Sequence, residues 1–490
     1  MKIILTILFL IVVFVSQVNT ITDTDLWGII KAGEYIVSSV SIPHLDIFSY
    51  ALGDVSWIDH EWLSQVLYFL IYTVFGLAGL NIFKALIVTA CFFILFSSDL
   101  FNDKKYTILP LMLGFLSILS FSYRSTLRPE ILSYLLLCIY IYTLEKEKRL
   151  WILLFLQIAW VNMHGFFILG PLVVLFYCLG SMIRRDNKRA IMLSGLFFLV
   201  SILNLLNPYG LKGAVYPLSV ARGLFNSQAI LFKETSELMM PIEMGFFSFV
   251  FFWALVMIVS VTFLLNLKKA RIEHALLFLA AFIVSFFSLR GVPVFSLTCM
   301  VPALYNTRGS GSNKKLNPKA YYILVLFITA SFLYIFLSNG YYKITHQYDF
   351  KKTGLAFARH LAPSKACDFL EERNIKGRIF HDPIFGSYIA YRFYPERRMF
   401  LDGRTELYGD KMYKMYKDAT ASIGSLEGLR GKYGFNIVML SNLFREKNKI
   451  APYLYSSADW KLVYHDGNFY IFLRDIPEYR SNIDRFKIEL

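Results

Sequence analysis

The sequence predicts a polytopic α-helical membrane protein of about eleven transmembrane helices that carries a small α/β domain at its C-terminal end. Hydrophobic residues make up 56% of the 490 positions, which is more apolar surface than a globular core of that length can bury. Apolar runs alternate with basic clusters as far as Leu337, and the composition becomes charged and mixed beyond Asn339. We therefore expect a transmembrane domain over residues 1–339 and an α/β domain over residues 340–490.

The charge balance and the cysteine spacing further limit the class of protein and its expected partners. Lys and Arg outnumber Asp and Glu by 50 to 35. No basic run is interleaved with aromatic residues, so we attribute the excess to cytoplasmic loops and anionic headgroups and expect membrane lipids, not nucleic acid, as partners. None of the five cysteines shows CxxC spacing, so neither a disulfide framework nor a thiolate zinc site is indicated.

The first apolar run covers residues 3–18 and is either a retained span or a cleaved signal peptide. The residues at its end, Val18-Asn19-Thr20, match a small-x-small cleavage site poorly, which favours a retained span. Asp25 emerges on the outer side in both cases.

Five basic clusters set the expected topology, because positive charge gathers in cytoplasmic loops. They lie at residues 104–105, 145–149, 184–189, 268–271 and 308–319. The predicted spans between and around them cover residues 3–18, 81–96, 106–121, 131–144, 151–161, 166–183, 191–206, 246–265, 275–287, 292–304 and 321–337. We expect a multi-pass protein of the plasma membrane, with the loop 207–244 and the C-terminal domain outside.

The segment Leu63–Gly76 does not fit this count. A single crossing must separate Asp25 outside from Lys104 inside, yet both residues 63–76 and residues 81–96 are apolar. We assign residues 63–76 to an amphipathic helix that lies on or re-enters the outer leaflet, and residues 81–96 to the second span.

The C-terminal part alternates short apolar runs with helical patterns, and none of the runs is long enough to cross a bilayer. Strands are predicted at residues 378–381, 398–401, 436–440, 461–464 and 469–473, and helices at residues 364–373, 410–417 and 426–432. This mixture predicts a small α/β domain.

The first outer loop, residues 19–62, is long, acidic and aromatic, so it is either a binding structure or a tether. Asp25 and the run Asp59-His60-Glu61 each abut an apolar segment, where an unpaired carboxylate is costly. We expect Glu34, Asp46 and Asp54 of the same loop to be ordinary solvated side chains.

This loop resembles the first outer loop of the GT-C glycosyltransferases. The similarity rests on Asp25 after the first span, the turn Ile42–Asp46, and His60-Glu61-Trp62-Leu63 before the next apolar helix. It is strongest toward bacterial membrane proteins that resemble aminoarabinose transferases and protein O-mannosyltransferases. It extends over most of the chain through residues 124–130, 160–165, 290–293 and 400–409.

The resemblance implies inverting transfer of a hexose or pentose from a polyprenyl-phosphate donor to a glycan, lipid or protein acceptor. It implies that Asp25 is the general base and that Glu61 binds a metal or the acceptor, with a divalent metal as the cofactor that it allows. His60 beside Glu61 is either a ligand or a surface histidine against the headgroups.

Arg124, Arg128 and Arg290 lie on the expected outer side, against the positive-inside trend. A guanidinium fork suits a donor phosphate, whereas the alternative is headgroup anchoring or pairing with Glu130. His164, in a tight turn, either points into the same cavity or makes a helix-end hydrogen bond.

Asp402 and Arg404 follow a predicted strand, where α/β proteins place binding residues, but the two could instead pair to fix the turn. The absence of a GxGxxG or Walker-type loop from the sequence argues against a nucleotide-sugar donor. A transporter or flippase would need buried charges within the spans, and we expect none. A non-catalytic scaffold with the same fold is the third alternative.

Overall fold

The computed structural model describes residues 2–96, 109–224, 236–268, 270–307, 317–442 and 449–489. The chain divides into two compact units. The first is built from Met1–Ile21, Ile71–Phe225 and Phe232–Phe357, and the second mainly from Thr22–Leu70 and Ala358–Leu490. Most of residues 19–62, the predicted first outer loop, therefore folds with the C-terminal residues. Two predicted basic clusters, residues 104–105 and most of 308–319, lie outside the described residues, as does Lys269.

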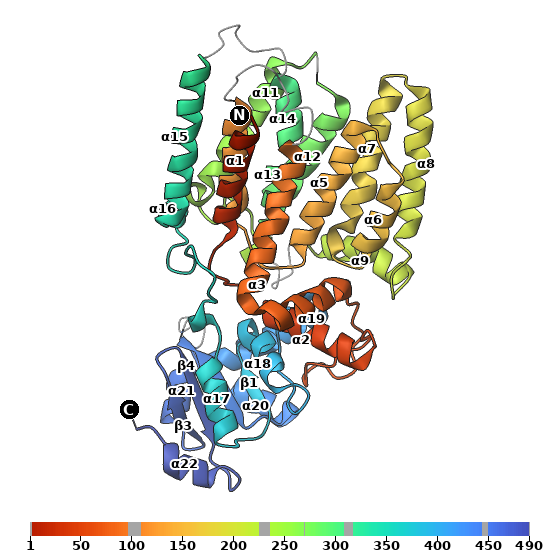
Figure 1. Cartoon of the computed structure of the whole chain (residues 1–490). Coiled ribbons are helices and arrows are strands. Elements are labelled where there is room, and N and C mark those ends of the chain that lie inside the picture. The colour runs from red at the N-terminus through yellow and green to blue at the C-terminus, as the bar shows by residue number, and fades with distance from the viewer. Residues whose placement is uncertain are drawn as a thin grey trace. The chain divides into compact units, whose positions relative to one another are not determined.

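The first unit is helical (Figure 1). Its elements are α1 (Lys2–Gln17), the later part of α3 (Trp62–Phe96), α4 (Leu109–Ser122), α5 (Glu130–Lys146), α6 (Ile152–Val161), η2 (Gly165–Ile168), α7 (Leu169–Ile183), α8 (Asn187–Leu203), α9 (Leu211–Leu224), η3 (Ser236–Leu238), η4 (Phe246–Phe249), α11 (Val250–Leu265), α12 (Ile272–Phe287), α13 (Gly291–Thr298), α14 (Met300–Thr307), α15 (Pro318–Leu337) and α16 (Gly340–Ile344). Helix α7 packs against α8 and α12, and α4 packs against α11 and α13.

Within the described residues, four helices are long and apolar enough to cross a membrane: Trp62–Leu95, Gly165–Ile183, Phe246–Leu265 and Lys319–Leu337. Exposed apolar side chains such as Phe327 and Leu265 lie on their surfaces, as on helices that face lipid. Every predicted span that falls on described residues contains helix, but the number of membrane crossings stays a prediction.

The predicted span 292–304 is covered by α13 and α14, which meet at Cys299, a residue with right-handed helical backbone angles. Pro302 has no N–H to donate to the carbonyl four residues earlier, which weakens the helical ladder at this point. The predicted span 292–304 is therefore helical, with one hydrogen bond of the ladder missing at Pro302.

Helix α3 is also interrupted, at Gly76, where φ is 63° and ψ is −163°. Nothing lies within 4 Å of a Cβ built at this position, so the backbone conformation, and not lack of space, favours glycine. The break falls where the sequence separates the amphipathic helix from the second span. The position of residues 63–76 in the membrane stays a prediction.

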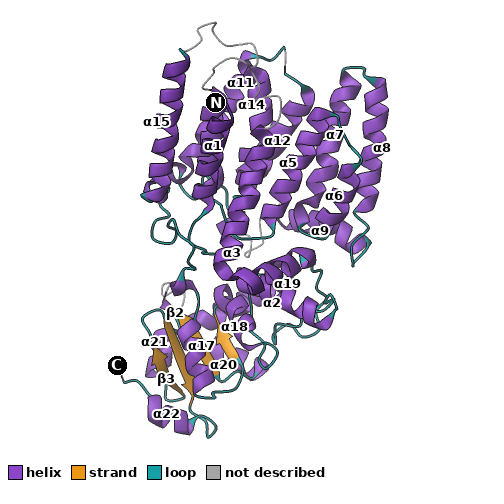
Figure 2. Cartoon of the chain, viewed as in Figure 1, coloured by secondary structure: helices purple, strands orange, loops and turns teal. Residues whose placement is uncertain are grey.

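The second unit contains a four-stranded sheet in the order β1-β2-β4-β3 (Figure 2). The strands are β1 (Ile379–His381), β2 (Ile437–Ser441), β3 (Trp460–His465) and β4 (Phe469–Arg474). Strands β1 and β2 are parallel, and β4 is antiparallel to both β2 and β3. The helices of this unit are α2 (Leu26–Ser39), the first turns of α3, η5 (Arg359–Leu361), α17 (Ser364–Glu372), η6 (Pro383–Phe385), α18 (Gly386–Phe393), α19 (Thr405–Ala421), α20 (Ile423–Tyr433), α21 (Ala451–Ser456) and α22 (Arg480–Phe486).

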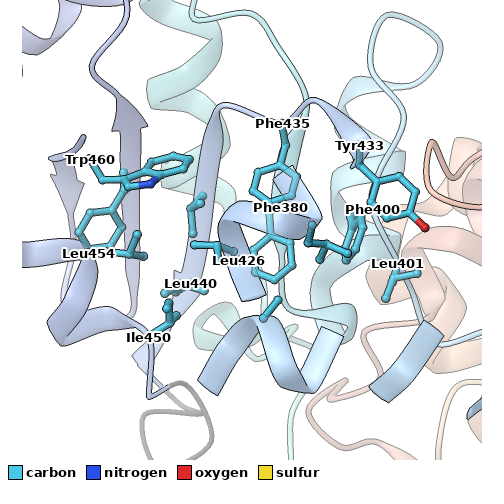
Figure 3. Close-up of a cluster of buried hydrophobic side chains, with 14 of the residues drawn as sticks. Phe380, Phe400, Leu401, Leu426, Tyr433, Phe435, Leu440, Ile450, Leu454 and Trp460 are labelled. Atoms are coloured by element: carbon cyan, nitrogen blue, oxygen red, sulfur yellow. The ribbon is translucent and has the colours of Figure 1, made fainter. Parts of the chain in front are cut away.

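A cluster of buried aromatic and aliphatic side chains forms the core of this unit (Figure 3). Phe380 of β1, Phe435 just before β2 and Phe400 are each fully buried. Burying a side chain of this size stabilises a fold by roughly 1.5–3 kcal/mol. The core therefore fixes Phe400 and Leu401, which directly precede Asp402.

Four of the five predicted strands form, but residues 398–401 do not. Met399 instead makes an isolated bridge with Ser49 of the first outer loop, exchanging hydrogen bonds with Phe48 and Tyr50. These partners belong to an irregular loop and cannot continue a ladder. The predicted helices 364–373, 410–417 and 426–432 correspond to α17, α19 and α20, whereas α2 and α18 were not predicted.

Candidate functional site

Asp25 lies in the second unit at the N-cap position of α2. Its backbone N–H donates to Oδ1 of Asp23 at 3.0 Å, and its carbonyl accepts from Ile29 at 3.1 Å. The positive end of the helix dipole favours a carboxylate at this position. The helix start thus positions a partly buried acid.

The turn Asp402-Gly403-Arg404 lies against Asp25. A Cβ added to Gly403 would lie 2.2 Å from Oδ1 and 2.6 Å from Oδ2 of Asp25, so glycine is needed for this close approach. Two sequence-predicted site segments, far apart in the chain, are therefore brought together within the second unit.

Arg404 connects the same turn to the first outer loop. Its Nη2 lies 2.8 Å from Oδ1 of Asp46, and its Nε lies 2.8 Å from Oδ2 of Asp402. The guanidinium lies over the ring of Trp57 at 4.6 Å. Although burial acts to lower it, Asp402, Tyr408 and Asp46 raise the pKa of Arg404 well above its usual value. The expectation that Asp46 is a solvated acid is wrong, because it is 2% exposed and ion-paired.

Asp59 is buried directly before α3. Its Oδ1 accepts a hydrogen bond from Gln65 Nε2 at 2.7 Å, whereas its Oδ2 has no hydrogen-bond partner among the described residues. Burial, followed by the neighbouring Glu61, raises the pKa of Asp59 to about 8, so this carboxyl group is protonated at neutral pH. The carboxylate of Glu61 lies 3.6 Å from Nε2 of His60.

These acids do not form a metal-binding group. Within the part of the chain that the structure describes, no three His, Cys, Asp or Glu side chains gather in an arrangement that could hold a metal ion. The expected roles of Glu61 and His60 toward a metal stay predictions, and no step proposed below uses a metal.

Arg124, Arg128 and Arg290 converge in the first unit on one carboxylate oxygen, Oε2 of Glu237. Arg128 Nη1 and Arg290 Nη2 each lie 2.8 Å from it, and Arg124 Nη2 lies 3.2 Å away. Glu237 belongs to the short helix η3. Arg124 also pairs with Glu130 at 2.6 Å. Pairing with Glu130 was one of the alternatives that the sequence left open. The three arginines that the sequence predicted to act together are therefore neighbours.

Lys351 is a buried cation next to this group that sequence analysis did not identify. Its Nζ donates to the carbonyl oxygens of Ser125 at 3.0 Å and Ser122 at 3.5 Å. Burial, and then the positive charge of Arg124, lower the pKa of Lys351 to about 7. No local pattern marked this lysine, because it follows the last predicted span at the start of a charged stretch.

His164 caps the short helix η2. Its Nδ1 accepts a hydrogen bond from the backbone N–H of Phe166 at 3.2 Å and lies 3.1 Å from Oγ of Ser133. This geometry is the helix-end hydrogen bond that sequence analysis named as one of the two alternatives for His164.

The apolar helices and the α/β unit give this chain a fold that resembles that of the GT-C glycosyltransferases. Comparison with solved structures shows this fold in the archaeal oligosaccharyltransferase AglB from Archaeoglobus fulgidus. In its complex with an inhibitory peptide and a dolichol-phosphate, AglB aligns with 97% of this chain over 75% of its own length, with a TM-score of 0.63 and 11% identity.

Other structures of the same oligosaccharyltransferase agree with this result. The apo form gives a TM-score of 0.59 at 12% identity, and the complex with Zn and sulfate gives 0.56 at 10% identity; each aligns with 96% of this chain and 74% of its own. No family model and no curated protein matches the sequence. At this level of identity the likeness concerns the fold, and it confirms the GT-C resemblance in that respect.

Proposed function

We propose that this chain is a membrane glycosyltransferase that moves a sugar from a polyprenyl-phosphate donor to an acceptor at the outer face of the membrane. The observation that carries the proposal is the convergence of Arg124, Arg128 and Arg290 on Glu237 in a chain with the GT-C fold. Guanidinium groups that hold a carboxylate can hold a phosphate with similar geometry. The AglB structures with a dolichol-phosphate and with an acceptor peptide support a lipid-phosphate donor.

The arginines would stabilise the leaving group. When the bond between the anomeric carbon and the phosphate oxygen breaks, the electron pair remains on the phosphate, and fixed cations favour that charge. Because Oε2 of Glu237 already accepts hydrogen bonds from Arg128 and Arg290, the donor phosphate must replace or share its place. Glu237 would therefore compete with the donor for the same N–H groups.

Asp25 would act as the general base. The acceptor oxygen or nitrogen attacks the anomeric carbon from the face opposite the phosphate, and its proton passes to the Asp25 carboxylate. The new bond then has inverted configuration. Glu61 is proposed to contact the acceptor, and the transferred sugar is proposed to be a hexose or a pentose.

Replacement of Asp25 tests this function. In an assay with a labelled polyprenyl-phosphate sugar, we expect Asp25→Asn to lower the transfer rate by about 10²- to 10⁴-fold, the usual effect of losing a positioned base. Asp54→Asn is the matched control, because Asp54 is an exposed acid of the same loop. Thermal unfolding of both variants should match that of the parent protein. Wild-type turnover by Asp25→Asn would contradict the assignment.

A transporter or flippase is the second candidate, because the expectation that no charge is buried within the apolar helices is wrong. Lys84 of α3 is 1% exposed, and Glu273 and His274 of α12 are fully buried. Each has a local partner, however. Lys84 contacts Asn19 at 3.1 Å. Glu273 pairs with Arg184 at 2.7 Å, and His274 lies 2.9 Å from Glu145. Movement of the labelled lipid across vesicles without product formation would favour this candidate.

A further inference from the structure

The second unit contains a cavity that plays no part in the proposed reaction. Its volume is about 820 Å³, within the usual range of small-molecule sites, roughly 300–1,000 Å³. Tyr50 of the first outer loop forms one wall, and the turn 374–378 between α17 and β1 forms another. The end of α18 and residues 395–398 complete the lining.

This cavity has a strong excess of positive charge. Five cations line it, namely Lys376, Arg378, Arg392, Arg397 and Arg398, against two carboxylates, Glu371 and Glu396. Arg392 is compensated, because it pairs with Glu371 and, at 2.8 Å, with Asp368. Among the residues that the structure describes, none of the other four cations forms an ion pair. The cavity therefore attracts anions.

Two of these arginines are held in place by neutral groups. Arg397 Nη2 donates to the carbonyl of Ile375 at 2.6 Å, and its guanidinium lies over the Phe393 ring at 4.6 Å. Arg378 Nη1 donates to the carbonyl of Tyr433 at 2.6 Å, and its guanidinium lies 5.2 Å from the centre of the Tyr50 ring. Carbonyl oxygens and aromatic rings thus orient each arginine, and neither guanidinium forms an ion pair with a carboxylate of the described residues.

The Arg397 guanidinium also has unused donor capacity. Its Nη1 is buried and has no hydrogen-bond acceptor within the described part of the chain. Burial lowers the pKa of Arg397, although the nearby Glu371 carboxylate acts in the opposite direction. An anion in the cavity would favour the charged guanidinium and so oppose the effect of burial.

We propose that this cavity binds the phosphate group of a ligand, held by Arg378, Arg397 and Arg398. A phosphate carries up to two negative charges and several acceptor oxygens, which matches three uncompensated guanidinium groups better than a single carboxylate does. Phe393, Pro395 and Ile375 offer apolar surface to the organic part of the ligand. The source of the phosphate is a soluble sugar phosphate or a phospholipid headgroup, and the two share this chemistry.

Binding measurements on the full chain in detergent test the proposal. We expect saturable binding of glucose 6-phosphate or of dihexanoyl phosphatidylglycerol by titration calorimetry, and no binding of glucose. Arg398→Glu should weaken the binding at least tenfold, equivalent to about 1.4 kcal/mol. Arg398 is exposed, so the variant should fold, and equal thermal unfolding of variant and parent checks this.

Lys365→Glu is the matched control, because Lys365 is an exposed cation of α17 that does not line the cavity. Binding of glucose 6-phosphate would identify a soluble source, and binding of the phosphatidylglycerol alone would identify a headgroup. No saturable binding of either probe, or an equal loss in Lys365→Glu and Arg398→Glu, would overturn the proposal.

Discussion

Glu237 is the common ion-pair partner of Arg124, Arg128 and Arg290. Although burial opposes it, Arg128, Arg124 and Arg290 hold the pKa of Glu237 well below its usual value. The carboxylate therefore stays charged at every physiological pH, and a donor phosphate held by these arginines, as proposed above, would compete with it. This residue lies in the predicted loop 207–244, where no neighbouring motif distinguishes it from a solvated acid.

Conservative replacement of an outer arginine separates phosphate binding from headgroup anchoring. We expect Arg128→Lys or Arg290→Lys to lower the affinity for a polyprenyl-phosphate sugar at least about tenfold, or roughly 1.4 kcal/mol, because lysine replaces a two-pronged donor with a point charge. Headgroup anchoring tolerates lysine, which snorkels equally well. The measurement is equilibrium binding of the labelled lipid.

Arg149→Lys is the control for this experiment, because Arg149 is exposed between α5 and α6. Its affinity for the lipid should not change. If Arg128→Lys and Arg290→Lys also leave the affinity unchanged, these arginines do not hold a donor phosphate.

The candidate site was only partly predictable at the level of single residues. The three arginines could be predicted because they depart from the positive-inside rule. Asp25 could be predicted because it follows the first apolar span. Gly403 could not be recognised, since an Asp-Gly-Arg sequence looks like an ordinary turn. Its special requirement comes from the carboxylate of a residue in a distant segment.

At the scale of elements, apolar runs located the helices of the first unit, and β-branched and aromatic runs located the strands. Sequence analysis missed α2 because it judged the first outer loop by its acidic composition. The apolar positions of this segment do recur with helical spacing, at Leu26, Ile29, Ile30 and Gly33, and these residues are buried. The helical spacing of apolar residues therefore indicates α2 better than the acidic composition of the loop does.

His381 of β1 should make the stability of the second unit depend on pH. Its Nε2 accepts from the N–H of Phe400 at 2.8 Å, its Nδ1 lies 3.0 Å from the Asp382 carbonyl, and burial lowers its pKa to about 4. In the unfolded chain the His381 side chain binds a proton near pH 6.5, and in the folded chain only near pH 4. Protonation therefore favours the unfolded chain, and stability should fall as the pH falls from 6.5 to 4.

We expect His381→Gln to be less stable than the parent protein at pH 7, by about 1–3 kcal/mol if the N–H of Phe400 loses its acceptor. The difference between the two should shrink as the pH falls from 6.5 to 4, because only the parent protein titrates at this position. Thermal unfolding at several pH values measures both effects. A constant difference across this range would show that His381 does not cause the pH dependence.

At the scale of the whole molecule, the charge clusters predict that the C-terminal part from Lys351 onward lies outside the membrane. A reporter that is active only in the cytoplasm should therefore be silent when fused after Leu490. The same reporter fused after Arg149, in a predicted cytoplasmic cluster, should be active. Strong activity of the Leu490 fusion would overturn the topology.

Hydrophobicity was sufficient to predict the class of this protein, but the makeup of its two units was not predictable. The predicted boundary at residue 339 rests on a local change in composition. The grouping of Thr22–Leu70 with Ala358–Leu490 depends on long-range contacts such as that between Asp46 and Arg404, which leave no local pattern.

This grouping has a consequence for the order in which the protein can mature during synthesis. Residues 22–70 leave the ribosome early, yet Gly403 and Arg404, which they contact, are made only after the last residue of the first unit. Until then Asp46 has no guanidinium partner, and the Asp25 carboxylate does not have the Gly403 backbone beside it. A chain that stops short of residue 402 can therefore contain every helix of the first unit and still lack an assembled Asp25 environment.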